Sequence, residues 1–173
     1  MRSLKMYKNQ CGIVLVVSLI MLLVMTLLGV SAMNTSLIAE KMAGNSRDVE
    51  LAFQAAESGL REGESWISNQ TVEPVATNDG SSRVWALEAM GSDISTKNQA
   101  WWMNNAEAYA SPIAKVNTVP HMIIEYQLFV PDDLLVGNGN GSEGLTYYRV
   151  TSRGTGGSDQ ARVLLQSTTA RRF

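Results

Sequence analysis

The sequence has little of the chemistry on which most enzymes and metal sites depend. Of its 173 residues, one is a cysteine, Cys11, and one is a histidine, His121. A single cysteine excludes an internal disulfide and a zinc site built from cysteines. The chain has no Gly-x-Ser-x-Gly motif and no phosphate-binding loop. One histidine does not by itself exclude a catalytic triad, but His121 follows Pro120 at the start of a predicted strand, where we expect an edge or surface position. The sequence therefore predicts a protein that is not an enzyme and needs no cofactor.

Charge is also scarce, and it is unevenly placed. The net formal charge is −2, and three of the basic residues fall within the first 12 positions. Without these three, 11 basic residues face 16 acidic ones. This balance argues against a nucleic-acid-binding protein, which would present a basic surface. Five basic residues gather near the C-terminus, where we expect them to point outward from strands: Arg149, Arg153, Arg162, Arg171 and Arg172.

The apolar run from Ile13 to Met33 contains no charged residue. As a helix, these 21 residues would span about 31 Å, which matches the hydrocarbon core of a bilayer. Arg2, Lys5 and Lys8 precede the stretch and predict a cytoplasmic N-terminus, because basic residues favour that side of the membrane. The sequence predicts a membrane-spanning segment over 13–33, with the rest of the chain outside the cytoplasm.

Three kinds of targeting signal could explain the boundary at Cys11-Gly12. A secretory signal has a shorter apolar run and a cleavage site of small residues after it. A lipoprotein signal places its apolar run before the cysteine, whereas only a polar, basic leader precedes Cys11. A basic leader that ends in glycine directly before an apolar helix resembles the signal of type IV prepilins. That resemblance implies that residues 1–12 are a leader, cut between Gly12 and Ile13, and that the new N-terminus at Ile13 is methylated.

A helical pattern continues beyond the apolar stretch, because no proline occurs from 13 to 73. We expect an amphipathic continuation over 34–67, so that 13–67 forms one helix. Its predicted buried face repeats at intervals of three and four residues: Val49, Phe53, Ala56, Leu60 and Gly63. Gly59 and Gly63 match a small-xxx-small pattern, and we expect them to allow close packing of the helix on a sheet rather than dimerisation.

The remaining residues, 68–173, predict a globular head in two parts. Residues 68–120 read as loops, with a turn at 78–82 and short helices at 84–90 and 98–110. Trp101 and Trp102 point in different directions on a helix, and at least one should pack in the core. Residues 121–173 predict strands at 121–130, 145–154 and 161–170. The fold class is therefore α+β, with one long N-terminal helix on a C-terminal antiparallel sheet of three or four strands.

The glycine-rich segment between the first two predicted strands carries several oxygen ligands. Calcium prefers such ligands in proteins. The spacing does not match an EF-hand, so a loop that only connects two strands is the simpler interpretation. The weak calcium candidates are Asp132, Asp133, Asn138 and Asn140.

A longer motif extends the resemblance from the leader into the helix. The segment E-K-M-A-G-N-S-R-D (40–48), followed by A-F-Q-A-A-E (52–57), is similar to the N-terminal signature of PilX-type minor pilins. The resemblance implies a non-enzymatic subunit that is cut by the prepilin peptidase and rests in inner-membrane lipid before assembly. It would then join other minor pilins, the major pilin and a large adhesin-like tip protein. Its implied role is to prime assembly of a cell-surface fibre used in twitching motility and adhesion, at or near the fibre tip.

One residue departs from the general pilin pattern. Most pilins have glutamate at the fifth position of the mature chain, and counting from Ile13 that position is Val17. Pilin-like proteins without this acid are associated with tip positions, so the departure implies a place at the end of the fibre. Two other interpretations remain: a pseudopilin of a secretion system, and a membrane-anchored periplasmic binding or enzyme domain that keeps its leader.

Overall fold

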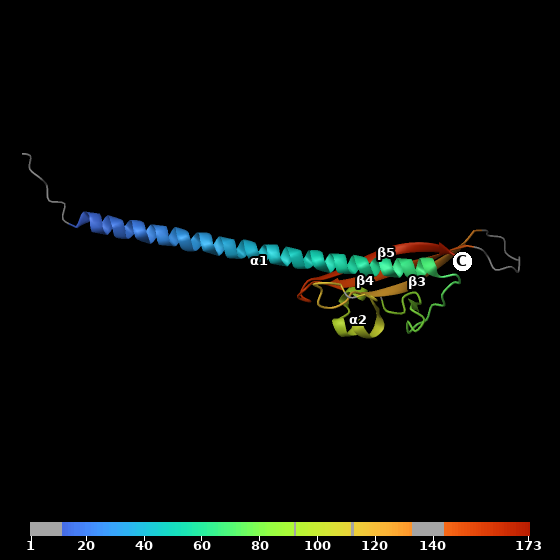
Figure 1. Ribbon diagram of the computed structural model, residues 1–173. Helices are drawn as coiled ribbons and strands as arrows, with labels where there is room; N and C mark the ends of the chain where they lie inside the picture. The colour runs from blue at the N-terminus through green and yellow to red at the C-terminus, as the bar shows by residue number, and fades with distance from the viewer. Residues whose placement is uncertain (1–11, 92, 112, 133–143) are drawn as a thin grey trace, which may run out of the picture. The chain divides into compact units, whose positions relative to one another are not determined.

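The computed structural model describes residues 12–91, 93–111, 113–132 and 144–173 (Figure 1). The chain divides into two compact units, Met1–Gly44 and Asn45–Phe173. We call the second one the head unit. Helix α1, Ile13–Asn69, contributes to both units. It begins at the residue predicted from the sequence and ends two residues later than predicted.

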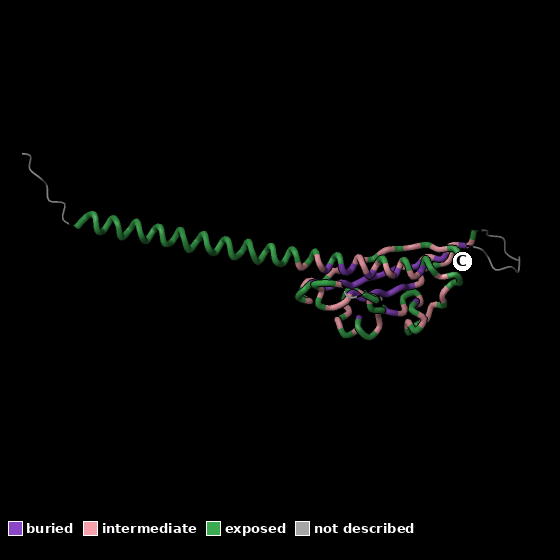
Figure 2. The backbone as a smooth tube through the Cα atoms, viewed as in Figure 1, coloured by how far each residue is buried: buried purple, intermediate pink, exposed green. Residues whose placement is uncertain are grey.

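In the first unit, the described residues from Gly12 onward are all exposed, as the green tube of Figure 2 shows. The hydroxyls that interrupt its apolar sequence bond back to the helix backbone. Ser18 Oγ donates to the carbonyl of Leu15 at 2.9 Å, and Thr26 Oγ1 donates to that of Leu23 at 2.8 Å. These bonds leave few free polar groups on the helix surface, as a helix in a lipid environment requires.

Three long antiparallel strands form the centre of the head unit: β3 (His121–Pro131), β4 (Gly144–Thr155) and β5 (Arg162–Arg172). They confirm the three predicted strands and the α+β class. Two short strands, β1 (Val84–Trp85) and β2 (Glu107–Ala108), pair with β3. Because β1 runs parallel to β3, the sheet is mixed and has five strands, rather than antiparallel with three or four.

Residues 84–90 do not form the helix that their apolar content predicted. Val84 and Trp85 are buried as a strand, and a turn follows over 87–90. Glu88 has a φ of 58° and Gly91 a φ of 86°, which a right-handed helix does not allow. Pairing with β3 and burial of Trp85 outweigh the weak helical preference of this segment. The turn predicted at 78–82 is confirmed, with the amide of Ser81 donating to Asp79 Oδ1 at 3.1 Å.

The second predicted helix is present but shorter. Helix α2 covers Gln99–Asn105, after a short 3₁₀ helix η1 at Ile94–Thr96. Asn98 caps α2, because its side chain accepts a hydrogen bond of 2.8 Å from the amide of Trp101. The helix ends where Glu107 and Ala108 pair with β3. Trp102 is 1% exposed, which confirms that one of the two adjacent tryptophans packs in the core.

The part of α1 in the head unit covers one face of the sheet, and its contact surface is made of small residues. The buried helix residues are Ala52, Ala55, Ala56, Gly59, Gly63 and Ile67. Gly59 lies against Ser152 and Gly63 against Val150, which confirms close helix–sheet packing. The predicted buried face was wrong at its N-terminal end, because Val49 and Phe53 are exposed. Gly154 of β4 approaches Ala52 and Ala56 so closely that only small helix residues fit there.

The other face of the sheet is covered by the segment between α1 and β3. Trp85, Met90 and Trp102 pack on Ile123 of β3 and form a second apolar cluster. The first cluster, around Ile67, Ile124 and Tyr148, lies between α1 and the sheet. The sheet is therefore a middle layer, buried from both sides along its centre, as the purple strands of Figure 2 show. Beside the second cluster, part of this sheet face stays open.

Candidate functional site: an exposed apolar helix and a polar hollow on the sheet

Helix α1 carries a continuous apolar surface. From Ile13 to Ala39 it has no Asp, Glu, Lys or Arg. It is long and apolar enough to cross a membrane, judged by length and composition. Because exposed apolar surface of this extent is unfavourable in water, lipid or other apolar helices must cover it. The first unit can therefore act as a membrane anchor and as a surface for packing against other helices.

The predicted cleavage junction lies where this helix begins. Gly12 has a φ of 83°, a backbone conformation that residues with a side chain rarely adopt, and its carbonyl accepts the first helical bond, from Val16. Ile13 is the first helical residue and is exposed. The peptide bond between the two residues thus stands at the end of regular structure. Cys11 lies outside the described residues.

Val17 lies one turn into the helix, with an exposed side chain. The nearest acidic residue along the helix is Glu40, more than twenty positions away. The described helix therefore offers no carboxylate near its N-terminus. Whatever amine or cation comes close to this turn must find its counter-ion elsewhere.

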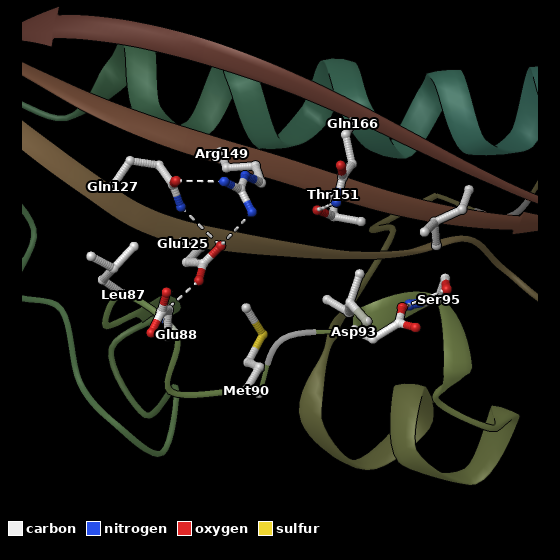
Figure 3. A pocket seen from close by; sticks show the side chains of 13 residues that line it. Leu87, Glu88, Met90, Asp93, Ser95, Glu125, Gln127, Arg149, Thr151 and Gln166 are labelled. Carbon is white, nitrogen blue, oxygen red and sulfur yellow. Dashed lines mark hydrogen bonds and ion pairs between the residues drawn. The ribbon is translucent and has the colours of Figure 1, made fainter.

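The head unit carries a polar hollow of about 500 Å³ on the sheet face opposite α1 (Figure 3). Its floor is formed by β3, β4 and β5, and residues within 87–91 and 93–95 form one wall. Glu125, largely buried, is the central group. Its Oε1 accepts from the backbone amide of Glu88 at 3.0 Å, and its Oε2 accepts from Gln127 Nε2 at 2.9 Å.

Arg149 completes this network from the neighbouring strand. Its Nη1 lies 3.5 Å from Glu125 Oε2, and its Nη2 donates to Gln127 Oε1 at 2.6 Å. Further along the floor, Gln166 Nε2 donates to Thr151 Oγ1 at 3.1 Å. Neither histidine nor cysteine occurs among the thirteen described residues that line the hollow. The described lining therefore presents hydrogen-bonding side chains, rather than a nucleophile paired with a histidine as its general base.

The sequence did not single out this network. Its signal is the alternation of polar and apolar residues: Glu125 and Gln127 flank Tyr126 on β3, and Arg149 and Thr151 flank Val150 on β4. Such alternation predicts one polar face for each strand. Only the register, in which Glu125 is the Cα partner of Arg149, brings the two polar faces together.

His121 and Arg153 are both buried, against the expectation of exposed positions. Each is 6% exposed, and they are Cα partners on β3 and β4. On its other side His121 pairs with Ala108 of β2, which the sequence did not reveal as a strand. Burial, together with the charge of Arg153, lowers the pKa of His121 below its usual value, although a backbone hydrogen bond at Val119 opposes the shift.

Of the four weak calcium candidates, only Asp132 lies among the described residues. Its carboxylate pairs with Arg172, and Arg172 Nη2 donates to Asp132 Oδ1 at 3.1 Å. Within the described ranges, no group of three or more His, Cys, Asp or Glu residues could hold a metal ion. Asp133, Asn138 and Asn140 lie outside those ranges.

Comparisons with known proteins agree with this architecture. A family model described as PilX N-terminal matches residues 12–61, and one described as Type IV pilus assembly protein PilX C-term matches residues 63–171. Neither a curated protein nor a solved structure matches the chain. The second family match alone covers more than half of the sequence, and the first begins at Gly12, directly before the apolar helix. The chain therefore belongs to the PilX family of type IV pilus minor pilins.

Proposed function

We propose that this minor pilin primes assembly of the type IV pilus and occupies the distal end of the fibre, as a structural subunit without catalysis of its own. The observation that carries the proposal is Val17, which stands where most pilins have an acid. Membership of the family implies interaction with other pilus components. The specific partners we propose are other minor pilins, the major pilin and a large adhesin-like tip protein.

The physical argument concerns the charge at the mature N-terminus. In a packed bundle of apolar helices, an unpaired amine is costly, and a carboxylate from an adjacent subunit offsets that cost. The turn that holds Val17 has no carboxylate, and none follows before Glu40. This subunit therefore cannot neutralise the amine of another subunit placed above it. The end of the fibre is the one position where no such neutralisation is needed.

The proposed route starts in the inner membrane. The basic leader stays cytoplasmic, α1 spans the bilayer through 13–33, and the head faces the periplasm. The prepilin peptidase cuts after Gly12, and the helix then leaves lipid for a bundle of other pilin helices. The exposed apolar side chains of the first unit support this route, because they suit both environments.

The position is tested by replacing Val17 with glutamate and locating the subunit with immunogold on sheared fibres. With the wild-type subunit, the gold label should be found at fibre ends. Val17→Glu should also place label along the shaft, because the new carboxylate can accept another subunit above it. Val16→Glu is the matched control, since it adds the same charge one residue away and should not spread the label. Uniform label along wild-type fibres would contradict the tip position.

The junction is tested by mass spectrometry of the mature N-terminus. Methylated Ile13 is expected. An intact Met1 would instead indicate a membrane-anchored periplasmic domain that keeps its leader. Recovery of the chain in sheared surface fibres distinguishes a pilus subunit from a secretion pseudopilin. Loss of fibres and of twitching upon deletion, with normal levels of the major pilin, is the expected result for a priming subunit.

A further inference from the structure

A second hollow, of about 340 Å³, adjoins the polar hollow on the same sheet face and is strongly cationic. Among the described residues, its lining has three basic side chains, Lys97, Arg153 and Arg162, and no acidic one. Trp102 and Leu164 add apolar wall. The two hollows share Ser95 and Leu164, so one bound segment could extend through both.

Arg153 is the central group of this cationic hollow. Although it is charged, only 6% of it is exposed, and its Nη2 has no hydrogen-bond partner among the residues that the structure describes. A buried guanidinium nitrogen without an acceptor is costly, and proteins rarely leave one so. The strand register explains the burial, since Arg153 lies between His121 of β3 and Leu164 of β5.

No described residue forms an ion pair with Arg153. The carboxylate of Asp159 attracts Arg153 from beyond ion-pair distance, and it accepts its own hydrogen bonds from Asn117 and Thr118. Burial and the charge of Arg162 lower the pKa of the Arg153 guanidinium. Burial is the larger of the two causes, so this position is unfavourable for the charged form of Arg153.

We infer that the cationic hollow binds an oxyanion, and that a protein carboxylate on an aliphatic stem fits it best. A guanidinium presents planar donors that match a carboxylate or a phosphate, and the two arginines and the lysine would share its charge. The apolar wall of Trp102 and Leu164 can pack against the carbon atoms beside a carboxylate, whereas a bare inorganic ion has no such atoms to bury. The adjoining polar hollow, with its amide side chains, offers hydrogen bonds to the rest of such a segment. This inference stands apart from the position of the subunit in the fibre.

Isothermal titration calorimetry on the full chain in detergent micelles tests the site with two probes. One is N-acetyl-glutamate α-amide, whose only carboxylate is the side chain, and the other is inorganic phosphate. Saturable binding is expected, with Arg162→Gln weakening it about tenfold through loss of one charged hydrogen bond. Arg172→Gln is the matched control: it removes an exposed arginine from the same strand, away from the hollow, and should leave binding unchanged.

A second variant, Arg153→Met, separates binding from folding. In buffer without oxyanions, its thermal unfolding midpoint should equal or exceed that of the wild type, because an unpaired buried charge is removed. It should no longer bind either probe. Tighter binding of the glutamate amide supports a protein carboxylate as the natural ligand, and tighter binding of phosphate supports a free inorganic oxyanion. Absence of saturable binding of both probes, equal weakening by Arg172→Gln, or wild-type binding by Arg153→Met would overturn the inference.

Discussion

Gly63 of α1 lies directly against Val150 of β4, so that a Cβ on Gly63 would stand 2.6 Å from Val150 Cγ1. Val150 is fully buried and branched at Cβ, so its methyl groups have little freedom to move aside. At the opposite end of the same contact, a Cβ on Gly154 would stand 2.3 Å from the backbone of Ala52 and Ala56. At Gly154 the strand therefore meets the helix backbone directly, and at Gly63 the helix backbone meets a buried side chain, so the contact requires small residues on both sides.

Substitution of these glycines should destabilise the head unit in a defined order. Gly63→Ala should lower the free energy of unfolding by about 1–3 kcal/mol, as overpacking of a core does. Gly154→Ala should cost more, because it meets backbone atoms that cannot rotate away. Gly44→Ala is the control, since nothing lies within 4 Å of its added methyl. Urea unfolding in detergent measures the series, and equal midpoints for Gly63→Ala and Gly44→Ala would refute the close contact.

Asp48 should hold the connection between β4 and β5 in place. Its Oδ1 accepts from the amide of Gly157 at 2.6 Å, and its other oxygen accepts from Ser158 Oγ. Asp48→Asn removes the charge from both bonds, and Asp48→Ala removes the bonds themselves. Both should speed amide hydrogen exchange over 156–161, whereas Glu50→Gln on the same helix should not.

The same bonds predict an acid-sensitive connection. The hydrogen bond from Ser158 lowers the pKa of Asp48 below 3.8, with backbone bonds at Gly157 and beyond adding to it. This stabilisation is complete above the pKa that Asp48 has in the unfolded chain. It is lost as the pH falls through the lower pKa that Asp48 has in the folded chain. The protection factors over 156–161, which correct exchange rates for the pH dependence of intrinsic exchange, should therefore fall below about pH 4 in the wild type and lose that dependence in Asp48→Ala. Wild-type protection factors unchanged by acid would contradict the role of Asp48.

His121 should make the head unit less stable in mild acid. Its folded-state pKa is lowered from 6.5, mainly by burial, so as the pH falls below about 7 the unfolded chain binds a proton that the folded chain excludes until the lower folded-state pKa is reached. The free energy of unfolding should fall as the pH drops, by at most about 1.4 kcal/mol per unit. His121→Gln should remove this slope. If the unfolding free energy of His121→Gln kept the pH dependence of the wild type, a group other than His121 would be responsible for it.

Glu125 should contribute more to stability than an exposed glutamate in a similar ion pair. Glu125→Ala leaves the amide of Glu88 and Nε2 of Gln127 without their acceptor, and Arg149 without its ion-pair partner, at a cost of about 1–3 kcal/mol. Glu107→Ala is the control, because its pair with Arg83 has both side chains 44% exposed. That pair should contribute less than about 1 kcal/mol. Thermal unfolding compares the two, and equal losses would contradict the buried network.

Local patterns in the sequence predict the long elements well. The absence of charge over 13–33 and of proline over 13–73 predicts α1, and alternation with β-branched residues predicts β3, β4 and β5. These sequence patterns fail where tertiary contacts override the local preference for a helix or for burial. Residues 84–90 look helical, yet Val84 and Trp85 pair with β3. Val49 and Phe53 look buried, yet the approach of Gly154 selects Ala52 and Ala56 for the contact.

By itself, the sequence determined the apolar helix, the glycine junction at its start, the valine in place of an acid at position 17 and the family to which these features point. All of these are properties of consecutive residues, and hydrophobicity and chain stiffness act over that range. Only the tertiary structure decided the polar network around Glu125, the burial of His121 and the burial of Arg153. Each of these depends on strand register, which pairs residues far apart in the sequence, such as Glu125 with Arg149 and His121 with Arg153, and thereby sets which charges find partners.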